Sequence, residues 1–162
     1  MLSALYEIES QIPGLLRQAG WNSMYINYHP PVVERLWRQI GDYRVYLHRI
    51  HPCSKEQALV HPHPWPSAIR VLKGCYEMGI GYGKGMDEPP IACKMIIEAS
   101  FVYEMVEPDG WHYVRPIDEP SYSLMVTGKP WDRPAPRSTE PLSPMSEERI
   151  TGLMDRFKAF YW

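Results

Sequence analysis

The sequence has little cysteine, and no arrangement of cysteine that would hold a small fold together or bind a metal. Its three cysteines, Cys53, Cys75 and Cys93, are an odd number without C-x-x-C spacing. Disulfide frameworks and thiolate zinc sites need paired or closely spaced cysteines. We therefore expect three reduced thiols that pack as small apolar side chains.

The sequence also lacks long apolar runs and blocks of like charge. No stretch approaches the ~18 apolar residues of a membrane-spanning helix, and Glu7 and Glu9 stand where a secretion signal needs basic and then apolar residues. The formal net charge is −2 and no five like charges follow one another, which favours neither nucleic acid nor a membrane as partner. We expect a soluble, cytoplasmic protein whose partner is a small molecule.

Proline, by contrast, is abundant and divides the chain into segments. The 162 residues include 17 prolines, roughly twice the average share of about 5%. The hydrophobic fraction of 44% is enough for the core of one domain. Within this single domain we expect an N-terminal helical flank over 1–41, a β-rich barrel over 42–128, and a Pro-rich arm with a C-terminal helix over 129–162.

The N-terminal flank has apolar residues at helical spacing. Pro13 should break or kink the first helix near Gln11, because proline removes a helical hydrogen bond. A second helix is expected over 32–40, opened by Pro30 and Pro31 and ended by Gly41.

The C-terminal flank begins with the polar, Pro-rich stretch 129–144, which we expect to be a loop, lid or wrapping arm. Ser143 and Pro144 should cap and begin a final helix. Its apolar face carries Ile150, Leu153, Met154 and Phe157.

The central region is rich in β-branched and aromatic residues, in runs separated by glycine-bearing turns. Several short strands without intervening helices predict an all-β sandwich or barrel. The runs lie at 42–51, 67–83, 93–105, 111–116 and 121–128.

Alternation within the run 67–83 separates an inward from an outward face. If Lys73–Gly74 forms a two-residue hairpin turn, Val71 lies opposite Tyr76 on an apolar face. Arg70 then lies opposite Glu77 on the other face. Apolar residues inside and paired charges outside are typical of a closed or sandwiched sheet.

Residues 59–68 read LVHPHPWPSA, so that His61 and His63 alternate with prolines. Continued backwards, the period of two places both imidazoles on the inward face. The prolines stiffen the backbone and lower the entropy that is lost when the two rings are ordered around a metal ion. Because proline donates no ladder hydrogen bond, the segment should lie at a strand start or sheet edge. The alternative is a Pro-rich surface loop with two solvated histidines.

The chain resembles the cupin superfamily in two regions, this segment and the stretch around and after the EPDG turn (107–110). The first cupin motif runs HxH, three or four residues, Glu, six residues, Gly; the second contains PxG followed closely by His. The stretch from His61 to Gly74 fits the first motif at every spacing, and Pro108 to His112 fits the second with one residue fewer before the histidine. The resemblance covers about residues 42–128. It implies a jelly-roll (double-stranded β-helix) barrel and a metal ion held by His61, His63 and His112.

One position departs from the cupin pattern. Ser67 stands where the common motif supplies a carboxylate ligand, so the resemblance implies a three-histidine site with Ser67 beside it. Neutral imidazoles leave the full 2+ charge on the ion and keep positions open for an anionic, chelating substrate and dioxygen. This resembles the three-histidine, iron-dependent thiol and diketone dioxygenases. Animal-type thiol dioxygenases have a cysteine near the position of Ser67 that is crosslinked to a tyrosine, and this chain cannot form that crosslink through Ser67.

The predicted function is therefore that of a metal-dependent cupin, a non-haem Fe(II) dioxygenase acting on a small substrate. Because imidazole also accepts Zn, Ni and Cu, two alternatives stay open: a non-catalytic or regulatory ligand-binding cupin, and a metal-dependent isomerase-type cupin. The apolar stripes of the terminal helices and the exposed sheet edges predict a homodimer.

Further side chains are candidates for the site. Inward Tyr76, Met78 and Tyr103 should contact substrate, although bulky inward residues are also plain core. Glu77 and Glu104 lie on the outward faces, which does not favour them as ligands. Candidate partners for a substrate carboxylate are Arg44, Arg49 and Arg115, and the histidines expected to be surface or structural groups are His29, His48 and His51.

Overall fold

The computed structural model describes residues 1–85, 87–133 and 141–162, which form two helices and ten strands. In chain order these are α1 (Leu2–Leu15), β1 (Asn22–Ile26), β2 (Val33–Ile40), β3 (Tyr43–Ile50), β4 (His61–Pro62), β5 (Ser67–Lys73), β6 (Cys75–Tyr82), β7 (Ile91–Glu98), β8 (Val102–Met105), β9 (Gly110–Pro116), β10 (Ser121–Thr127) and α2 (Glu147–Tyr161). The β-rich fold with a helix toward each end agrees with the predicted class.

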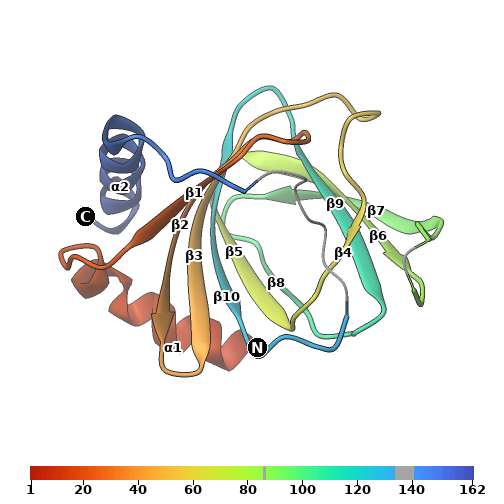
Figure 1. Ribbon diagram of the computed structural model, residues 1–162, viewed down its shortest axis with the longest axis horizontal. Helices are drawn as coiled ribbons and strands as arrows, with labels where there is room; N and C mark the ends of the chain where they lie inside the picture. Colours follow the sequence, from red (N-terminus) through yellow and green to blue (C-terminus); the bar gives the residue numbers. More distant parts are fainter. Residues whose placement is uncertain (86, 134–140) are drawn as a thin grey trace.

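The strands form two antiparallel sheets (Figure 1). The larger sheet has the order β1-β2-β3-β10-β5-β8, and the smaller has the order β4-β9-β6-β7. This architecture is consistent with a cupin-like β-sandwich. The predicted closed barrel is corrected, because among the described strands no ladder joins one sheet to the other.

Both helices pack on the outer face of the larger sheet (Figure 1). Alternate residues of β3, such as Val45 and Leu47, point to the helices, where they are fully buried. The apolar face predicted for the C-terminal helix is confirmed, because Leu153 and Phe157 are buried in this core and Ile150 and Met154 pack against it. Burying one such side chain contributes about 1.5–3 kcal/mol, so the helices stabilise one face of the sheet, while its other face is turned to the smaller sheet.

The segment predicted as a second helix is a strand. Val33–Ile40 form β2, which pairs with β3 across a turn at Gly41–Asp42. Leu36 faces the helices whereas Arg35 faces the space between the sheets, so the period is two rather than 3.6. The sequence predicts a helix stop at Gly41, but its φ of +55° is what a tight hairpin turn requires.

The predicted hairpin at Lys73–Gly74 is also wrong. β5 already pairs with β10 and β8, and β6 with β9 and β7, so neither strand has a free edge for the other. The chain instead passes from one sheet to the other at Gly74. Its φ is +82°, and a Cβ there would lie 3.0 Å from the carbonyl oxygen of Pro120, so glycine is needed at the crossing.

The charges expected to pair across that hairpin have other partners. Arg70 Nε lies 2.7 Å from a carboxylate oxygen of Glu9 in α1. Glu77 accepts a 2.7 Å hydrogen bond from the Tyr113 hydroxyl and lies 3.7 Å from Arg115. Glu77 does not line the cavity between the sheets, in agreement with the outward face that alternation predicts.

The run 93–105, expected as one strand, is divided between the sheets. β7 pairs with β6 in the smaller sheet, and β8 pairs with β5 in the larger. Between them Ser100 has a φ of +73°, where the chain changes direction. Strand pairing thus overrides a continuous local pattern.

The helix ends differ in two details from the prediction. α1 continues past Gln11 to Leu15 with Pro13 inside it, because the missing N–H affects only the last turn. α2 is capped by Ser146, not Ser143: the Ser146 side chain accepts a hydrogen bond from the backbone N–H of Arg149, and acidic residues follow it in the first turn, as the helix dipole favours.

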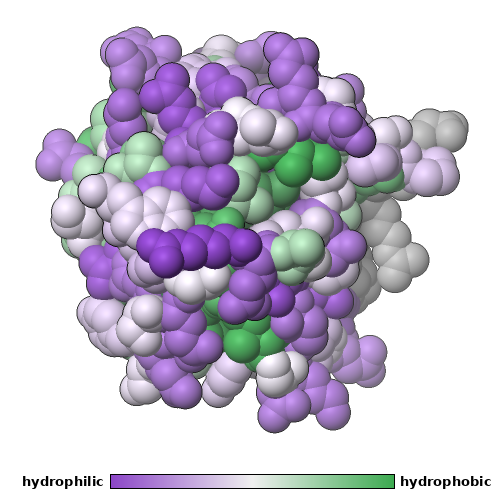
Figure 2. All heavy atoms as spheres, turned by 90° about the vertical axis from the view of Figure 1, so that its left-hand side faces the viewer, coloured by the Kyte–Doolittle hydropathy of each residue, from purple (hydrophilic) through white to green (hydrophobic). Residues whose placement is uncertain are grey.

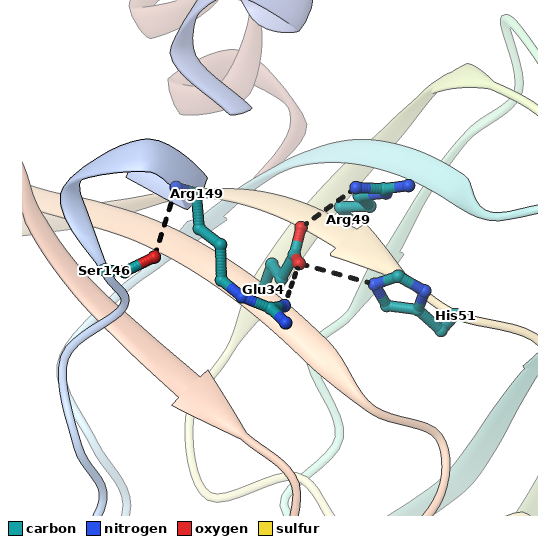
Figure 3. A network of polar contacts seen from close by, with 5 residues as sticks. All are labelled: Glu34, Arg49, His51, Ser146 and Arg149. Atoms are coloured by element: carbon teal, nitrogen blue, oxygen red, sulfur yellow. Dashed lines mark hydrogen bonds and ion pairs between the residues drawn. The ribbon is translucent and has the colours of Figure 1, made fainter. Parts of the chain in front are cut away.

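A buried carboxylate joins α2 to the larger sheet (Figure 3). Glu34 of β2 is 3% exposed, and its oxygens lie 2.6 Å from Arg149 of α2 and 3.3 Å from Arg49 of β3. His51 Nε2 lies 3.7 Å away. Because a carboxylate removed from water needs such partners, the network favours one position of α2 on the sheet.

Replacing Arg149 by methionine should lower the free energy of unfolding by about 1–3 kcal/mol, because it removes a hydrogen bond to a charged, buried group. Urea denaturation measures the change. The control Lys158→Met removes an exposed pair with Asp155 in the same helix and should change stability by less than about 0.5 kcal/mol. Equal losses in the two variants would contradict the role given to Glu34.

The α2 side of the molecule is largely polar (Figure 2). Hydrophilic side chains cover most of this face, and hydrophobic ones show in the gaps between them. In the described part of the chain, neither helix combines the length and the apolar character needed to cross a membrane. Cys53, Cys75 and Cys93 are free thiols, as predicted, but none lies in the core: Cys53 and Cys75 are half-buried and Cys93 is exposed.

The Pro-rich stretch 129–144 is described only at its ends, since residues 134–140 lie outside the described residues. The Trp131 N–H donates to the carbonyl oxygen of Pro64 at 2.9 Å, and the Tyr25 N–H donates to that of Ser143 at 3.0 Å. Both described ends therefore run along the sheets, in agreement with a wrapping segment.

Candidate metal centre

A cavity of about 230 Å³ lies between the two sheets. Its walls come from all six strands of the larger sheet on one side and from β4, β6 and β9 on the other. Most lining side chains are apolar or aromatic, and among the described lining residues none is Asp or Glu. The volume is roughly that of eight water molecules, which suits a small ligand.

The His-Pro-His segment forms the edge of the smaller sheet. His61 of β4 lies directly opposite His112 of β9, and Pro62 lies opposite Trp111. The His63 N–H donates to the carbonyl oxygen of Gly110 at 3.2 Å. β4 has one neighbour only, so a proline without a donor is tolerated there. The predicted edge position is confirmed, and the alternative of a solvated surface loop is not supported.

His61, His63 and His112, the three-histidine cluster, line this cavity together. The ring centroids of His61 and His112 are 4.6 Å apart, and those of His63 and His112 are 4.8 Å apart. The Nε2 atoms of His61 and His112 are separated by 3.1 Å. Two nitrogens bound at right angles to one ion, each at about 2.1 Å, would lie about 3.0 Å apart. The spacing of this pair therefore fits two ligands of one ion.

Backbone contacts determine which nitrogen of two rings is free. His61 Nδ1 lies 3.0 Å from the carbonyl oxygen of Leu59, and His63 Nδ1 lies 3.2 Å from that of Trp65. A carbonyl oxygen only accepts, so Nδ1 carries the proton in both rings and Nε2 keeps its lone pair. Metal-binding histidines are held in this way.

His112 is in a different tautomer. Because the Nε2 atom of His61 can only accept, His112 Nε2 donates the hydrogen bond between them, and the buried Nδ1 of His112 has no partner among the described residues. Within those residues no group of three or more His, Cys, Asp or Glu side chains is arranged so that it could hold a metal ion as it stands. For His112 Nε2 to present a lone pair to an ion, the proton of this ring has to move to Nδ1.

Burial keeps the three-histidine cluster uncharged. It lowers the pKa of His61 to about 4 and that of His63 to about 3, and it holds the pKa of His112 well below the ordinary value. The cause is that a buried imidazolium loses its hydration. Neutral imidazole is the form that binds a metal ion, so no proton has to leave an imidazolium at neutral pH.

Ser67 supports one ring of the cluster. Ser67 is fully buried, and its Oγ lies 3.1 Å from His63 Nδ1, the ring nitrogen that carries the proton. Ser67 therefore positions His63 and does not replace the carboxylate ligand of the common cupin motif.

Replacing Ser67 by alanine should weaken metal binding about tenfold, since losing a group that orients a ligand typically has this effect. Competition with a chromogenic chelator measures the affinity. Ser121→Ala is a matched control, because Ser121 is equally buried and its Oγ has no partner among the described residues; it should not change the affinity. Unaltered affinity in Ser67→Ala would contradict the positioning role.

Two of the three predicted substrate contacts line the cavity. The hydroxyl oxygens of Tyr76 and Tyr103 are 2.8 Å apart. Burial raises the pKa of Tyr103 to about 12 and that of Tyr76 well above its ordinary value, so both hydroxyls stay protonated. Met78 is 1% exposed and packs in the core with Val71 and Ile97, so the geometry does not favour substrate contact for it.

The three arginines considered as carboxylate partners are occupied elsewhere. Arg44 stacks over the Trp37 ring at 4.8 Å. Arg49 pairs with Glu34, and Arg115 pairs with Glu77. None of the three lines the cavity.

Sequence reasoning missed several cavity residues, among them Arg35, His48 and Ser123, and His29 also lines the cavity. Arg35 was hidden because its segment was interpreted as a helix. His48 was expected at the surface or hydrogen-bonded, yet it is 6% exposed and its Nε2 atom has no partner among the described residues. Alternation within 42–51 places His48 on the face opposite Val45 and Leu47, and the sequence does not indicate that this second face is covered as well. His29 Nδ1 lies 2.9 Å from the Pro30 carbonyl oxygen, as a structural histidine would.

No protein-family model and no curated protein matches the chain. Among solved structures, AerE from Microcystis aeruginosa is 20% identical, with 78% of this chain and 54% of that chain covered and a TM-score of 0.50. Hydroxypropylphosphonic acid epoxidase from S. wedmorenis is 13% identical, with 66% and 55% covered and a TM-score of 0.49. KdgF from Halomonas sp. is 12% identical, with 74% and 90% covered and a TM-score of 0.47.

The chain spans about half the length of AerE and of the epoxidase. At such low identity the likeness concerns the fold alone, and this fold is cupin-like.

Proposed function

We propose that this protein is a metal-dependent enzyme that binds a divalent ion through the three-histidine cluster and converts a small molecule held in the cavity. The observation that supports this most is the pair of Nε2 atoms of half-buried His61 and buried His112, which lie 3.1 Å apart. The backbone contacts that hold the Nδ1 atoms of His61 and His63 support it further.

The proposed ion is Fe(II) and the proposed reaction is a dioxygenation. Three neutral imidazoles would leave the full 2+ charge on the ion. No carboxylate among the described residues lines the cavity to reduce this charge. Such an ion supplies a redox-active Lewis acid with positions for a substrate and for dioxygen. Zn, Ni and Cu suit the same nitrogen donors.

The chain contributes a largely apolar pocket and one free proton donor. Because one hydroxyl of the Tyr76–Tyr103 pair donates to the other, the second keeps its proton for a substrate oxygen. With the pKa of both raised by burial, they act as hydrogen-bond donors at neutral pH and not as phenolate bases. The apolar lining excludes water and strengthens these contacts.

The tyrosine pair also favours a second candidate, a redox-neutral isomerase-type reaction in which the ion acts only as a Lewis acid. Proton donors beside a polarised substrate oxygen serve such a reaction without dioxygen. A cytoplasmic location and a homodimeric state remain predictions from the sequence.

The test is metal analysis of protein purified without chelators or added metal, followed by oxygen uptake against thiols and 1,3-diketones. About one iron per chain with substrate-dependent uptake supports the dioxygenase. Zinc without uptake favours the isomerase-type reaction. Protein that retains no divalent ion, even after anaerobic loading with Fe(II), contradicts both candidates.

A further inference from the structure

A row of three polar side chains crosses the inner face of the larger sheet. Arg35 of β2 lies directly opposite His48 of β3, and His48 lies directly opposite Ser123 of β10. Residues paired in this way project from the same face of the sheet, and all three line the cavity. We call Arg35, His48 and Ser123 the polar row.

The polar row is bracketed by apolar residues. Two residues along the strands in one direction lie Val33 and Ile50, which are paired with each other. In the other direction lie Met125 and Ile69, which are also paired. All four residues line the cavity. A few polar groups in an otherwise apolar wall are what fixes the orientation of a small ligand.

The charge of Arg35 has no counter-ion in the cavity. Among the described residues no carboxylate lies within ion-pair distance of its guanidinium, and none lines the cavity. The guanidinium packs over the Tyr46 ring at 4.8 Å, and its Nε atom is buried without a hydrogen-bond partner among the described residues. Arg35 is half-buried, and a cation partly withdrawn from water is costly unless an anion pairs with it.

His48 adds a second unpaired polar atom to the same wall. The ring is 6% exposed, stacks on Tyr46 with centroids 5.6 Å apart, and has a buried Nε2 atom without a partner among the described residues. Burial, and next the charge of Arg35, lower the pKa of His48, so the ring is neutral and can present one N–H group. An unpaired buried polar atom in a native fold calls for a partner.

We propose that Arg35 and His48, with Ser123 beside them, form a subsite for the carboxylate of a small organic acid whose apolar part lies against the flanking residues of the same wall. A single arginine flanked by neutral donors matches a monoanion and planar carboxylate geometry. That this acid is the substrate rests on the proposed function, because the three-histidine cluster lines the same cavity. The subsite itself does not depend on a metal ion.

The first experiment compares carboxylates with matched neutral amides, using benzoate, phenylacetate and hexanoate as probes against benzamide, phenylacetamide and hexanamide. Binding is measured by saturation-transfer NMR and calorimetry on protein freed of metal with a chelator. We expect the tightest carboxylate to bind about tenfold more tightly than its amide, since a hydrogen bond to a charged group is worth that much. Equal binding of acid and amide, or no binding of any acid, would overturn the subsite.

Variants locate the preference. Arg35→Gln should remove the preference for carboxylate over amide, and His48→Gln should weaken this preference severalfold. Arg35→Lys should keep part of the preference and controls for a folding defect in Arg35→Gln. Arg44→Gln is the matched control, because Arg44 lies in the neighbouring β3 and stacks over Trp37 outside the cavity lining; it should leave the preference unchanged. An undiminished preference in folded Arg35→Gln overturns the assignment.

Metal content separates this inference from the proposed function. A carboxylate preference that depends on Arg35 in a protein unable to retain a divalent ion supports the subsite and refutes the metal enzyme. A protein that retains the ion through its histidines but shows no carboxylate preference refutes the subsite and leaves the metal enzyme standing.

Discussion

Replacing His112 by alanine should abolish metal retention while the two sheets stay folded. The variant removes one of the two Nε2 atoms that lie 3.1 Å apart, so at most two imidazoles remain. We expect the affinity to fall by more than the roughly hundredfold that follows loss of a supporting contact. β9 keeps its ladders to β4 and β6, so the fold does not depend on this ring. The same loss is expected for His61→Ala and for His63→Ala.

Metal content per chain after dialysis, with circular dichroism for the fold, measures this effect. Glu77→Gln is the matched control, because Glu77 lies on a neighbouring strand but faces Tyr113 and Arg115 and not the cavity. It should retain metal like the unmodified protein. Metal retained by His112→Ala and lost by Glu77→Gln would refute the three-histidine assignment.

The metal-free protein should lose stability steeply as the pH falls from 6.5 to 4.5. The folded pKa values of His61 and His63, about 4 and about 3, lie below the ordinary 6.5, so the unfolded chain takes up protons in this range before the folded protein does. Their stabilising contribution is present above pH 6.5 and is lost as the pH falls toward the folded values. Two pH units at about 1.4 kcal/mol each lower the free energy of unfolding by about 2–3 kcal/mol for each ring. This is a large part of the total free energy of unfolding of a typical protein, about 5–15 kcal/mol.

Urea midpoints at pH 7.0, 5.5 and 4.5 in the presence of a chelator measure this loss. His63→Leu keeps the volume filled and removes one titrating ring, so its stability should depend less on pH. A midpoint that stays constant or rises toward pH 4.5 would show that these imidazoles are not held neutral by burial.

The side chains that face the cavity were predictable where only local alternation was needed. His61, His63, Tyr76 and Tyr103 were expected inside, and all four line the cavity. This succeeded although the hairpin register was wrong, because the period of two within a strand does not depend on which strand is its neighbour.

Strand partners and helix ends were less predictable. Proline before and glycine after a segment mark the ends of helices and of hairpin strands alike, so β2 was interpreted as a helix and Arg35 was not considered. The crossing at Gly74 depends on β10 and β8 occupying both edges of β5, which are pairings over long sequence separations. His48 was missed because a single histidine in a strand gives no sign of which groups lie across the sheet.

X-ray absorption spectroscopy of the protein loaded with Fe(II) tests the central claim most directly, because it counts the imidazoles that bind the ion. We expect a shell of nitrogen and oxygen atoms near about 2.1 Å with scattering from three imidazole rings. A sulfur shell near about 2.3 Å, or scattering from no more than one imidazole, would contradict a metal centre built from His61, His63 and His112.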